Sequence, residues 1–185
     1  MIIIGNALDL RDMQFSDLGV IQHWSHPSHE WHKFNGPYYP PAPVEEIPEI
    51  ISRYAKSIAV DQLPLLRRRL MIVDKNDECI GIVSRYWISE ETNWTAIGIS
   101  IWNPENWSKG YGYDALGLWC TYLFASEPKF TRLDLRTWSG NYGMMKLAEK
   151  LRFKREAIFR KARIVKGQYY DGLGYGILRE EWEAK

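Results

Sequence analysis

The sequence predicts an α/β fold in which helices flank a twisted sheet of mixed, mostly antiparallel strands. Three observations carry this prediction. Three segments with strand-like patterns follow one another between residues 65 and 101, then come a helix, a strand and a helix, and a strand pair ends the chain. With 185 residues, 45% of them apolar and 25% charged, the chain has the composition expected of one soluble globular domain covering 1–185.

Ahead of residue 65 the sequence predicts one strand, two helices and an ordered loop. Apolar residues recur at helical spacing through 45–57, and Pro48 falls in the first turn, where proline is tolerated. Four prolines within 29–43 exclude a long helix or a central strand, and the aromatic residues there favour an ordered loop. We expect a strand at 8–11, a helix capped by Ser16 or Asp17 that ends at Trp24, the loop at 29–43 and a helix at 45–57.

From residue 65 onward the pattern changes to strands. The stretch 65–87 holds two apolar runs joined by five polar residues at 74–78, which is typical of a hairpin. In the next strand Ile97, Ile99 and Ile101 alternate with small residues. The expected elements are strands at 65–73 and 80–87, a strand ending at Ile101, a helix at 113–125, a strand at 131–137, a helix at 142–151 and a hairpin of 159–165 with 170–178.

A glycine-spaced loop follows the strand that ends at Ile101. The turn-forming stretch 103–106 ends the strand, and Lys109-Gly110-Tyr111-Gly112 leads into the next helix. Glycines let the backbone approach a ligand, and N–H groups at a helix N-terminus favour an anion such as pyrophosphate. The loop lacks the Gly-Lys-Ser/Thr of a P-loop. Ala115 could complete a dinucleotide fingerprint, but repeated parallel strand–helix units do not precede it.

Two blocks of sequence resemble one family. IGISIWNPENWSKGYGYDAL resembles the acyl-CoA-binding motif of the GNAT acetyltransferases, Gln/Arg-x-x-Gly-x-Gly/Ala, with Trp107 in the first position. WSGNYGMMKLAEKLRFKREA, residues 138–157, is similar to the family's Asn-x-x-Ser-x-x-x-x-Glu-Lys-x-Gly-Phe segment. Both look most like the branch containing ribosomal-protein alanine N-acetyltransferases and spermidine acetyltransferases. The resemblance implies a GNAT-like fold with an acyl-CoA-binding core at about 94–157 and acceptor-side elements at about 12–60.

The resemblance also implies an activity. An acetyl-CoA-dependent N-acetyltransferase would move an acetyl group to a primary amine by direct transfer in a ternary complex, where proximity supplies much of the acceleration. A non-catalytic acyl-CoA-binding or interaction domain is the alternative. A bulge in the strand ending at Ile101 would leave backbone groups open to the thioester and the pantetheine arm. The residues expected to bind acetyl-CoA are Ile99, Ser100, Ile101, Trp107, Ser108, Lys109, Gly110, Tyr111, Gly112, Tyr113 and Asn141.

Asn141 is expected to contact the pantetheine arm or an ordered water. Ser139-Gly140-Asn141 is also a helix N-cap sequence, and both roles can hold at once. The chain departs from the family's pattern at Met144, at Arg152, and at Ala148, where some members carry a tyrosine that protonates the leaving thiolate.

The acceptor amine must lose a proton, so either a base or a chain of waters must take it. The catalytic candidates are Asn141, Glu30 and Glu90, with Glu91 beside the last, and a solvated surface position is the alternative for each glutamate.

The four histidines His23, His26, His29 and His32 recur every third residue. Pro27 interrupts any helix that would align them, so no metal is expected, and a role in shaping the acceptor pocket stays open. The run Arg67-Arg68-Arg69 falls in an expected strand, where alternate side chains face opposite ways and do not form one basic stripe.

Composition limits the partners and the compartment. A net charge of +1 gives no reason to expect nucleic acid or an anionic membrane, and apolar runs stay short of the ~20 residues of a membrane span. Cys79 and Cys120 are expected to be buried thiols in the reducing cytoplasm, and neither has the surroundings of a nucleophile. The acceptor is expected to be a small-molecule amine or a peptide or protein N-terminus. The resemblance implies that the loop at 30–39 and the closing hairpin line the acceptor site. The acidic cluster Glu45-Glu46-Glu49 slightly favours a cation, and the aromatic content is compatible with a homodimer.

Overall fold

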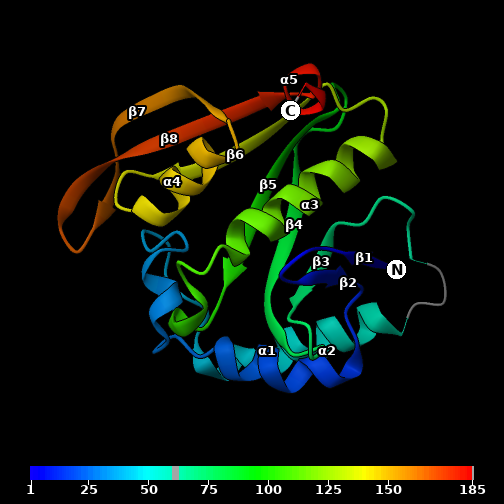
Figure 1. Ribbon diagram of the computed structural model, residues 1–185. Helices are drawn as coiled ribbons and strands as arrows, with labels where there is room; N and C mark the ends of the chain where they lie inside the picture. The colour runs from blue at the N-terminus through cyan, green and yellow to red at the C-terminus, as the bar shows by residue number, and fades with distance from the viewer. Residues whose placement is uncertain (60–62, 185) are drawn as a thin grey trace.

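The computed structural model describes residues 1–59 and 63–184. Eight strands within these ranges form one sheet in the order β1-β2-β3-β4-β5-β6-β8-β7 (Figure 1). Neighbouring strands are antiparallel except β5 and β6, which are parallel, so the mixed, mostly antiparallel sheet is confirmed. The strands are β1 (Ile2–Ile4), β2 (Asp9–Arg11), β3 (Arg69–Val73), β4 (Cys79–Ser89), β5 (Trp94–Ile101), β6 (Arg132–Trp138), β7 (Lys154–Val165) and β8 (Gln168–Leu178).

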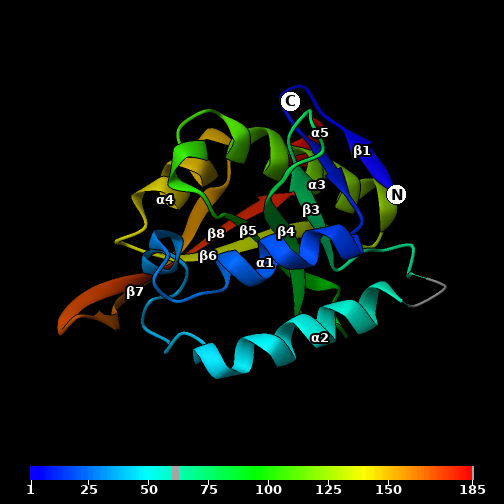
Figure 2. The ribbon, with the colours of Figure 1, turned by 90° about the horizontal axis from the view of Figure 1, so that it is seen from below.

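Helices cover both faces of the sheet (Figures 1 and 2). The helices α3 (Tyr111–Ser126) and α4 (Tyr142–Lys150) pack on one face. On the other face α1 (Leu18–Trp24) lies beside α2 (Ile47–Ile58). The short α5 (Arg179–Glu183) follows β8, and its Trp182 packs against the apolar cluster on the α3 face. None of the helices in the described ranges is both long and apolar enough to cross a membrane.

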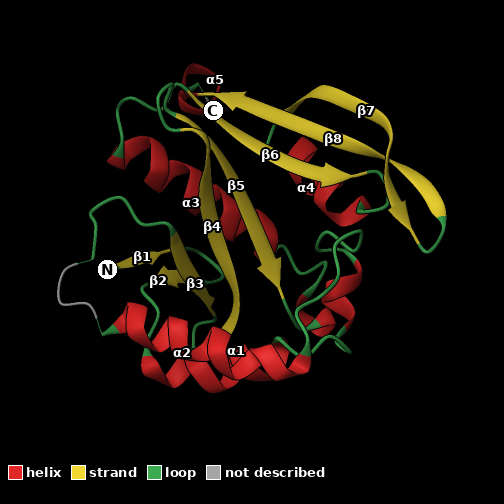
Figure 3. Cartoon of the chain, turned by 180° about the vertical axis from the view of Figure 1, so that it is seen from behind, coloured by secondary structure: helices red, strands yellow, loops and turns green. Residues whose placement is uncertain are grey.

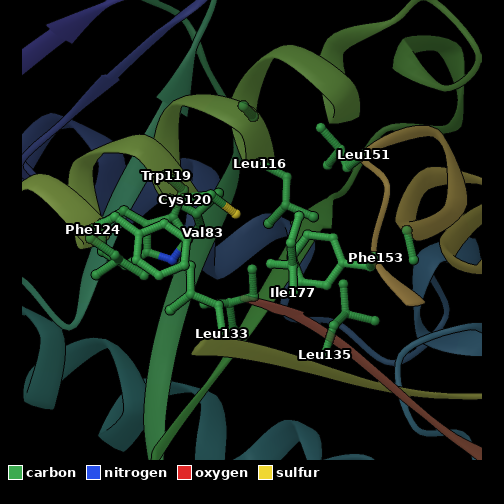
Figure 4. Packing of buried hydrophobic residues seen from close by; sticks show 14 of the residues in the cluster. Val83, Leu116, Trp119, Cys120, Phe124, Leu133, Leu135, Leu151, Phe153 and Ile177 are labelled. Carbon is green, nitrogen blue, oxygen red and sulfur yellow. The ribbon is translucent and has the colours of Figure 1, made fainter. Parts of the chain in front are cut away.

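The larger apolar cluster lies between the sheet and α3 (Figure 4). Leu116 and Trp119 of α3 are fully buried and pack with Val83 of β4 and Leu133 of β6. Because the buried indole of Trp119 donates a hydrogen bond to Ser84 O at 3.0 Å, burying this polar group leaves no donor unsatisfied. The burial of α3 on several sides explains why its apolar residues follow no narrow stripe.

A smaller cluster lies on the opposite face, under α1 and α2. It consists of Ile21 of α1, Met71 and Val73 of β3, and Trp102, which follows β5. Successive residues of a strand face opposite sides of a sheet. Ile99 and Ile101 therefore face α3 and α4, whereas Ser100 faces the α1 and α2 side together with Trp102.

The strands β5 and β6 separate after a short parallel contact. Their paired residues run from Thr95 with Leu133 to Ile97 with Leu135, whereas β4 pairs with β5 as far as Ile101. Figure 3 shows the two strands starting together and diverging toward their C-terminal ends. The end of β5 thus has a strand neighbour on the β4 side and an open edge on the other.

Several element boundaries differ from the sequence-based expectation. β3 begins at Arg69 rather than residue 65, because Arg67 leaves the ladder to bind Asp12 through its guanidinium at 2.7 Å. β7 begins five residues before 159, and its exposed, charge-rich residues carry no apolar alternation that would mark a strand. β1 was not predicted. Val60, the last residue of the expected acceptor-side stretch 12–60, lies outside the described residues.

Asp17 takes the expected N-cap position of α1 but makes no capping hydrogen bond. Its carboxylate instead accepts two hydrogen bonds from the guanidinium of Arg11, at 2.8 and 2.9 Å, and one from Gln14 N at 2.7 Å. The position of Asp17 at the start of α1 was predicted correctly, but its expected capping role was not. The sequence alone did not show that Arg11 would be buried beside it.

Candidate active site

The open edge of β5 presents backbone groups that no strand uses. Trp102 N donates to Ile80 O, so even-numbered residues of this stretch form the ladder with β4. The backbone groups of Ile99 and Ile101 consequently face the side from which β6 diverges. Ile101 O accepts from the indole of Trp107 at 2.8 Å, and the groups of Ile99 remain open to a ligand.

The expected bulge in β5 is not what opens this edge. The register shift between β4 and β5 lies at Trp87 and Ser89, at the far end of the pair, whereas the pairing near Ile101 is regular. Divergence of β6, rather than a local distortion of β5, exposes the backbone.

The glycine loop forms the N-terminus of α3. Gly110 is the N-cap residue with φ 87°, a left-handed conformation that favours glycine. The first helical hydrogen bonds run from Tyr113 N and Asp114 N to Gly110 O, so the N–H groups of Tyr111 and Gly112 precede the helical ladder. These N–H groups stand at the positive end of a 16-residue helix, which suits an anion.

Gly112 has a second role in packing. A Cβ at this position would lie 3.3 Å from a methyl carbon of Leu147. The absence of a side chain therefore lets the start of α3 approach α4 closely, and the two helix N-termini border one space.

A cavity of about 490 Å³ lies at this place, and we name it the cofactor cavity. Its walls come from the end of β5, the glycine loop, α4 and the loop after α1. The lining residues used below are Ile99, Ser100, Ile101, Trp107, Ser108, Gly110, Gly112, Tyr113, Asn141, Met144, Lys146, Leu147, Lys150, Trp31, Phe34 and Asn35.

Two lysines of α4 make one side of this cavity cationic. Lys146 and Lys150 are four residues apart, so they share one face of the helix. The ammonium of Lys150 lies 4.7 Å from the ring centre of Tyr113, and Tyr113 also lines the cavity. Together with the N-terminus of α3, the two charges can hold phosphate groups.

Asn141 joins three elements. Its Oδ1 accepts from Met144 N at 3.0 Å and so caps α4, as the N-cap sequence predicted. Its Nδ2 donates at 3.2 Å to Phe34 O, in the loop after α1, and the indole of Trp138 donates to the same oxygen at 3.0 Å. The side chain faces the cofactor cavity while it holds that loop against the sheet.

A second cavity, of about 420 Å³, lies on the opposite face of the sheet, and we name it the acceptor cavity. Trp31, Asn35 and Ser100 line both cavities. The other walls are built by α1, α2 and strands β3 to β5, including Trp24, Tyr54, Arg69, Ser84, Tyr86 and Trp102. The two cavities therefore meet around Ser100.

Some of the expected site residues lie elsewhere. Lys109 and Tyr111 do not line the cofactor cavity, and Tyr111 packs against the larger apolar cluster. Glu30 is half exposed, 3.9 Å from the ammonium of Lys33, and lines neither cavity. Glu90 lies in the turn between β4 and β5, at the end of that strand pair remote from Ser100.

The histidines gather at the end of α1 without lining either cavity. The rings of His23 and His29 are 4.6 Å apart, and His29 also lies 4.5 Å from the ring of Trp24. Burial lowers the pKa of His32, whose ring lies against Trp31. Within the described residues, no three His, Cys, Asp or Glu side chains are grouped closely enough to hold a metal ion.

The cavity roles of Lys146, Lys150 and Arg69 were not predicted from the sequence. The two lysines had a readable signal, since they lie one helical turn apart and follow Asn141 on the same helix. The loop at 30–39 was expected on the acceptor side, and its Trp31 and Asn35 do line the acceptor cavity. The closing hairpin, expected there too, lines neither cavity. Arg69 was grouped with its neighbours in a charge run.

Comparison with known proteins identifies the family. Residues 7–154 match the family model described as the acetyltransferase (GNAT) domain. The chain therefore belongs to the GNAT acetyltransferase family, as the glycine loop and the Asn141 segment indicated. Membership of this family and the N-acetyltransferase names of the relatives together identify the protein as an acetyl-CoA-dependent N-acyltransferase.

Two curated relatives are similar over much of the chain. The chain is 24% identical over 176 residues to the uncharacterized N-acetyltransferase p20 of Bacillus licheniformis, covering 95% of this chain and 94% of the relative. It is 25% identical over 123 residues to the SPbeta prophage-derived uncharacterized N-acetyltransferase YokL of Bacillus subtilis, covering 66% and 68%.

Solved structures share the fold. A GNAT-family acetyltransferase from Bacillus anthracis aligns with a TM-score of 0.75 at 20% identity, covering 98% of this chain and all of the other. The spermidine N-acetyltransferase from Vibrio cholerae, solved in complex with CoA and spermine, aligns with a TM-score of 0.77 at 21% identity, covering 96% and 98%. At these identities the likeness establishes the fold.

Proposed function

We propose that the protein transfers an acetyl group from acetyl-CoA to a primary amine by direct transfer in a ternary complex. The single observation that carries this proposal is the junction of the two cavities at Ser100, Trp31 and Asn35. A cofactor on one face of β5 and an amine on the other can meet there without a carrier residue. Holding both reactants in one complex is itself a large source of rate acceleration.

The residues of the cofactor cavity fit acetyl-CoA. The N–H groups before the α3 ladder, with Lys146 and Lys150, provide positive charge where the pyrophosphate and a further phosphate would lie. The open backbone groups of Ile99 can pair with amides of the pantetheine arm, as a neighbouring strand would. When bound, acetyl-CoA supplies the acetyl group as a thioester. Asn141 and Ser100 border the inner end of this path.

Direct transfer agrees with the state of the cysteines. Burial raises the pKa of Cys79 to about 12, so its thiol stays protonated near neutral pH and is a poor nucleophile. Cys120 is fully buried within the larger apolar cluster. Neither thiol lines a cavity.

We further propose that the amine's proton leaves through water in the acceptor cavity. The described residues that line this cavity include the hydroxyl-bearing Ser84, Ser100 and Tyr86, and they include no carboxylate and no histidine. Burial raises the pKa of Tyr86, so the phenol keeps its proton and acts as a hydrogen-bond donor. Ordered water between such hydroxyls can carry the proton to solvent.

The test is calorimetry of acetyl-CoA binding to the wild type, Gly110→Glu and Gly167→Glu. Gly110 (φ 87°) and Gly167 (φ 78°, in the β7–β8 turn) both adopt left-handed backbone conformations, and a Cβ at either site meets no atom within 4 Å. The backbone strain and added charge are thus matched. Only Gly110→Glu places the charge in the cofactor cavity, and we expect that variant to lose binding at least tenfold while Gly167→Glu binds like the wild type.

A thiol-release assay with a panel of primary amines completes the test. Release of CoA that depends on an amine supports transfer. Binding of acetyl-CoA with no release for any amine would support a non-catalytic acyl-CoA-binding domain. Equal binding by Gly110→Glu and the wild type would contradict the assigned cavity.

A further inference from the structure

The charged residues that line the acceptor cavity are all arginines. Three arginines are among its lining residues, Arg68, Arg69 and Arg85, and the described lining contains no aspartate or glutamate. The acidic cluster Glu45-Glu46-Glu49, which slightly favoured a cationic acceptor, is exposed at the start of α2 and lines neither cavity. The charge of the cavity wall therefore favours an anion.

Arg69 is the arginine whose side chain faces this space. It opens β3 on the same side as Met71 and Val73, which belong to the cluster under α1 and α2. Its guanidinium carbon lies 5.1 Å from the ring centre of Tyr54 in α2, and Tyr54 lines the cavity too. None of the ion pairs among the described residues includes Arg69.

The sheet register places Arg69 near Ser100, where the two cavities meet. Arg69 pairs with Ser84 of β4, and Ser84 pairs with Gly98 of β5. Adjacent strands are about 4.8 Å apart, so the backbones of Arg69 and Gly98 are separated by about 10 Å. Ser100 is the next residue on the same face of β5. Because the Arg69 side chain extends from the backbone, a ligand has to cover only part of this distance.

Of the other two arginines, Arg85 does not turn its charge toward the cavity. Arg85 directs its guanidinium to the opposite face, where it donates to Arg67 O at 3.0 Å and lies 5.0 Å from the ring centre of Trp87. Burial, and then the charge of Arg68, lower the pKa of Arg85. Arg69 remains the residue able to contact a ligand directly.

We propose that the acceptor is a small primary amine that itself carries a carboxylate or a phosphate, and that Arg69 binds this anionic group. The inference rests on the proposed N-acetyl transfer and names its substrate class. The guanidinium binds the anion while the aromatic walls formed by Trp24, Tyr54 and Trp102 contact the carbon chain, which leaves the amine directed toward Ser100. A polyamine such as spermidine would bring positive charge to this positive wall.

The test uses acceptors that differ only in the anionic group. O-phosphoethanolamine is compared with ethanolamine, β-alanine with its carboxamide, and spermidine serves as the cationic acceptor. Wild type is expected to prefer the anionic member of each pair at least tenfold in kcat/KM. In Arg69→Gln this ratio should fall to near one, Arg69→Lys should retain part of it, and Arg53→Gln should leave it unchanged. Arg53 is an exposed residue of α2 that lines neither cavity.

A general defect from misfolding would lower kcat/KM equally for both acceptors of a pair. The ratio of the two values therefore reports charge recognition alone. A preference for spermidine, or an anionic preference that Arg69→Gln leaves intact, would overturn the inference while N-acetyl transfer itself still stood. Calorimetry of O-phosphoethanolamine with CoA-saturated wild type and Arg69→Gln gives a readout without turnover. Equal affinity for the two proteins would also overturn the inference, whether or not the enzyme turns over.

Discussion

Asn141 and Phe34, 107 positions apart in the chain, are joined by a hydrogen bond in which Asn141 Nδ2 donates to Phe34 O at 3.2 Å. Because Oδ1 of the same amide caps α4, one side chain fixes both the helix and the loop that carries Trp31 and Asn35. Those two loop residues line both cavities. The position of the amide thus couples α4 to the junction of the two cavities.

Substitution of Asn141 should separate these contributions. Asn141→Ala loses the cap and the link to Phe34, and we expect it to lower the free energy of unfolding by about 1–2 kcal/mol. Asn141→Asp keeps a capping oxygen but loses the donor to Phe34 O, so its stability should be closer to wild type. Both variants should raise the KM for acetyl-CoA. Urea unfolding and steady-state kinetics check this, and an Asn141→Asp enzyme with unchanged KM would contradict the role of the loop link.

The α4 lysines should contribute to cofactor affinity by charge. We expect Lys146→Ala and Lys150→Ala each to weaken acetyl-CoA binding about fivefold, since each removes one exposed cation that can contact a phosphate. The difference from wild type should shrink at 1 M NaCl, where screening is strong. Lys56→Ala, at an exposed position of α2 outside both cavities, is the matched control. Calorimetry at two salt concentrations measures both effects, and losses that do not respond to salt would argue against a phosphate contact.

The route of the amine's proton predicts a particular pH dependence. If water takes the proton, kcat/KM should rise about tenfold per pH unit while the acceptor is protonated and level off above the pKa of its amine. The pH at which the profile levels off should then move when one acceptor is replaced by another with a different amine pKa. Thiol-release rates between pH 6 and 10 with two such acceptors provide the measurement. A profile that levels off at the same pH for both would instead reveal a base on the enzyme.

The ion pair between Arg11 and Asp17 predicts a large stability effect outside the site. The two side chains are 6% and 3% exposed, whereas Asp77, the other partner of Arg11, is 62% exposed. Asp17→Asn leaves a buried guanidinium without its main counter-charge and should lower the free energy of unfolding by about 3 kcal/mol. Asp77→Asn should cost about 1 kcal/mol or less. Equal losses in urea unfolding would contradict the burial argument.

The cofactor side could be predicted from sequence because its signals are local. Alternation through Ile97, Ile99 and Ile101 marks the strand, and the spacing of Gly110 and Gly112 marks the helix N-terminus that follows. Asn141 was found in the same way, from an N-cap pattern. In each case the residues that build the feature are neighbours in the chain.

Apart from the loop at 30–39, the acceptor side could not be predicted, because its other walls meet only through the sheet register. Arg69, Ser84 and Ser100 come from three strands, and whether they share a face depends on pairings that the sequence does not show. Glu30 and Glu90 were chosen by residue type, and the fold places both away from the cavities. The first residues of β7 were not predicted as part of a strand, because most residues of this strand are exposed and show no apolar alternation.

The two cavities lie on opposite faces of β5, so the proposed function gives each substrate its own entrance. An amine can enter or leave from the α1 and α2 side while the cofactor stays in place on the α4 side, and the reverse holds equally. With the substrates in these two cavities, as proposed, neither has to wait for the other, and we expect a steady-state mechanism without a compulsory order. Free CoA and the acetylated amine should each compete with the substrate that uses the same opening.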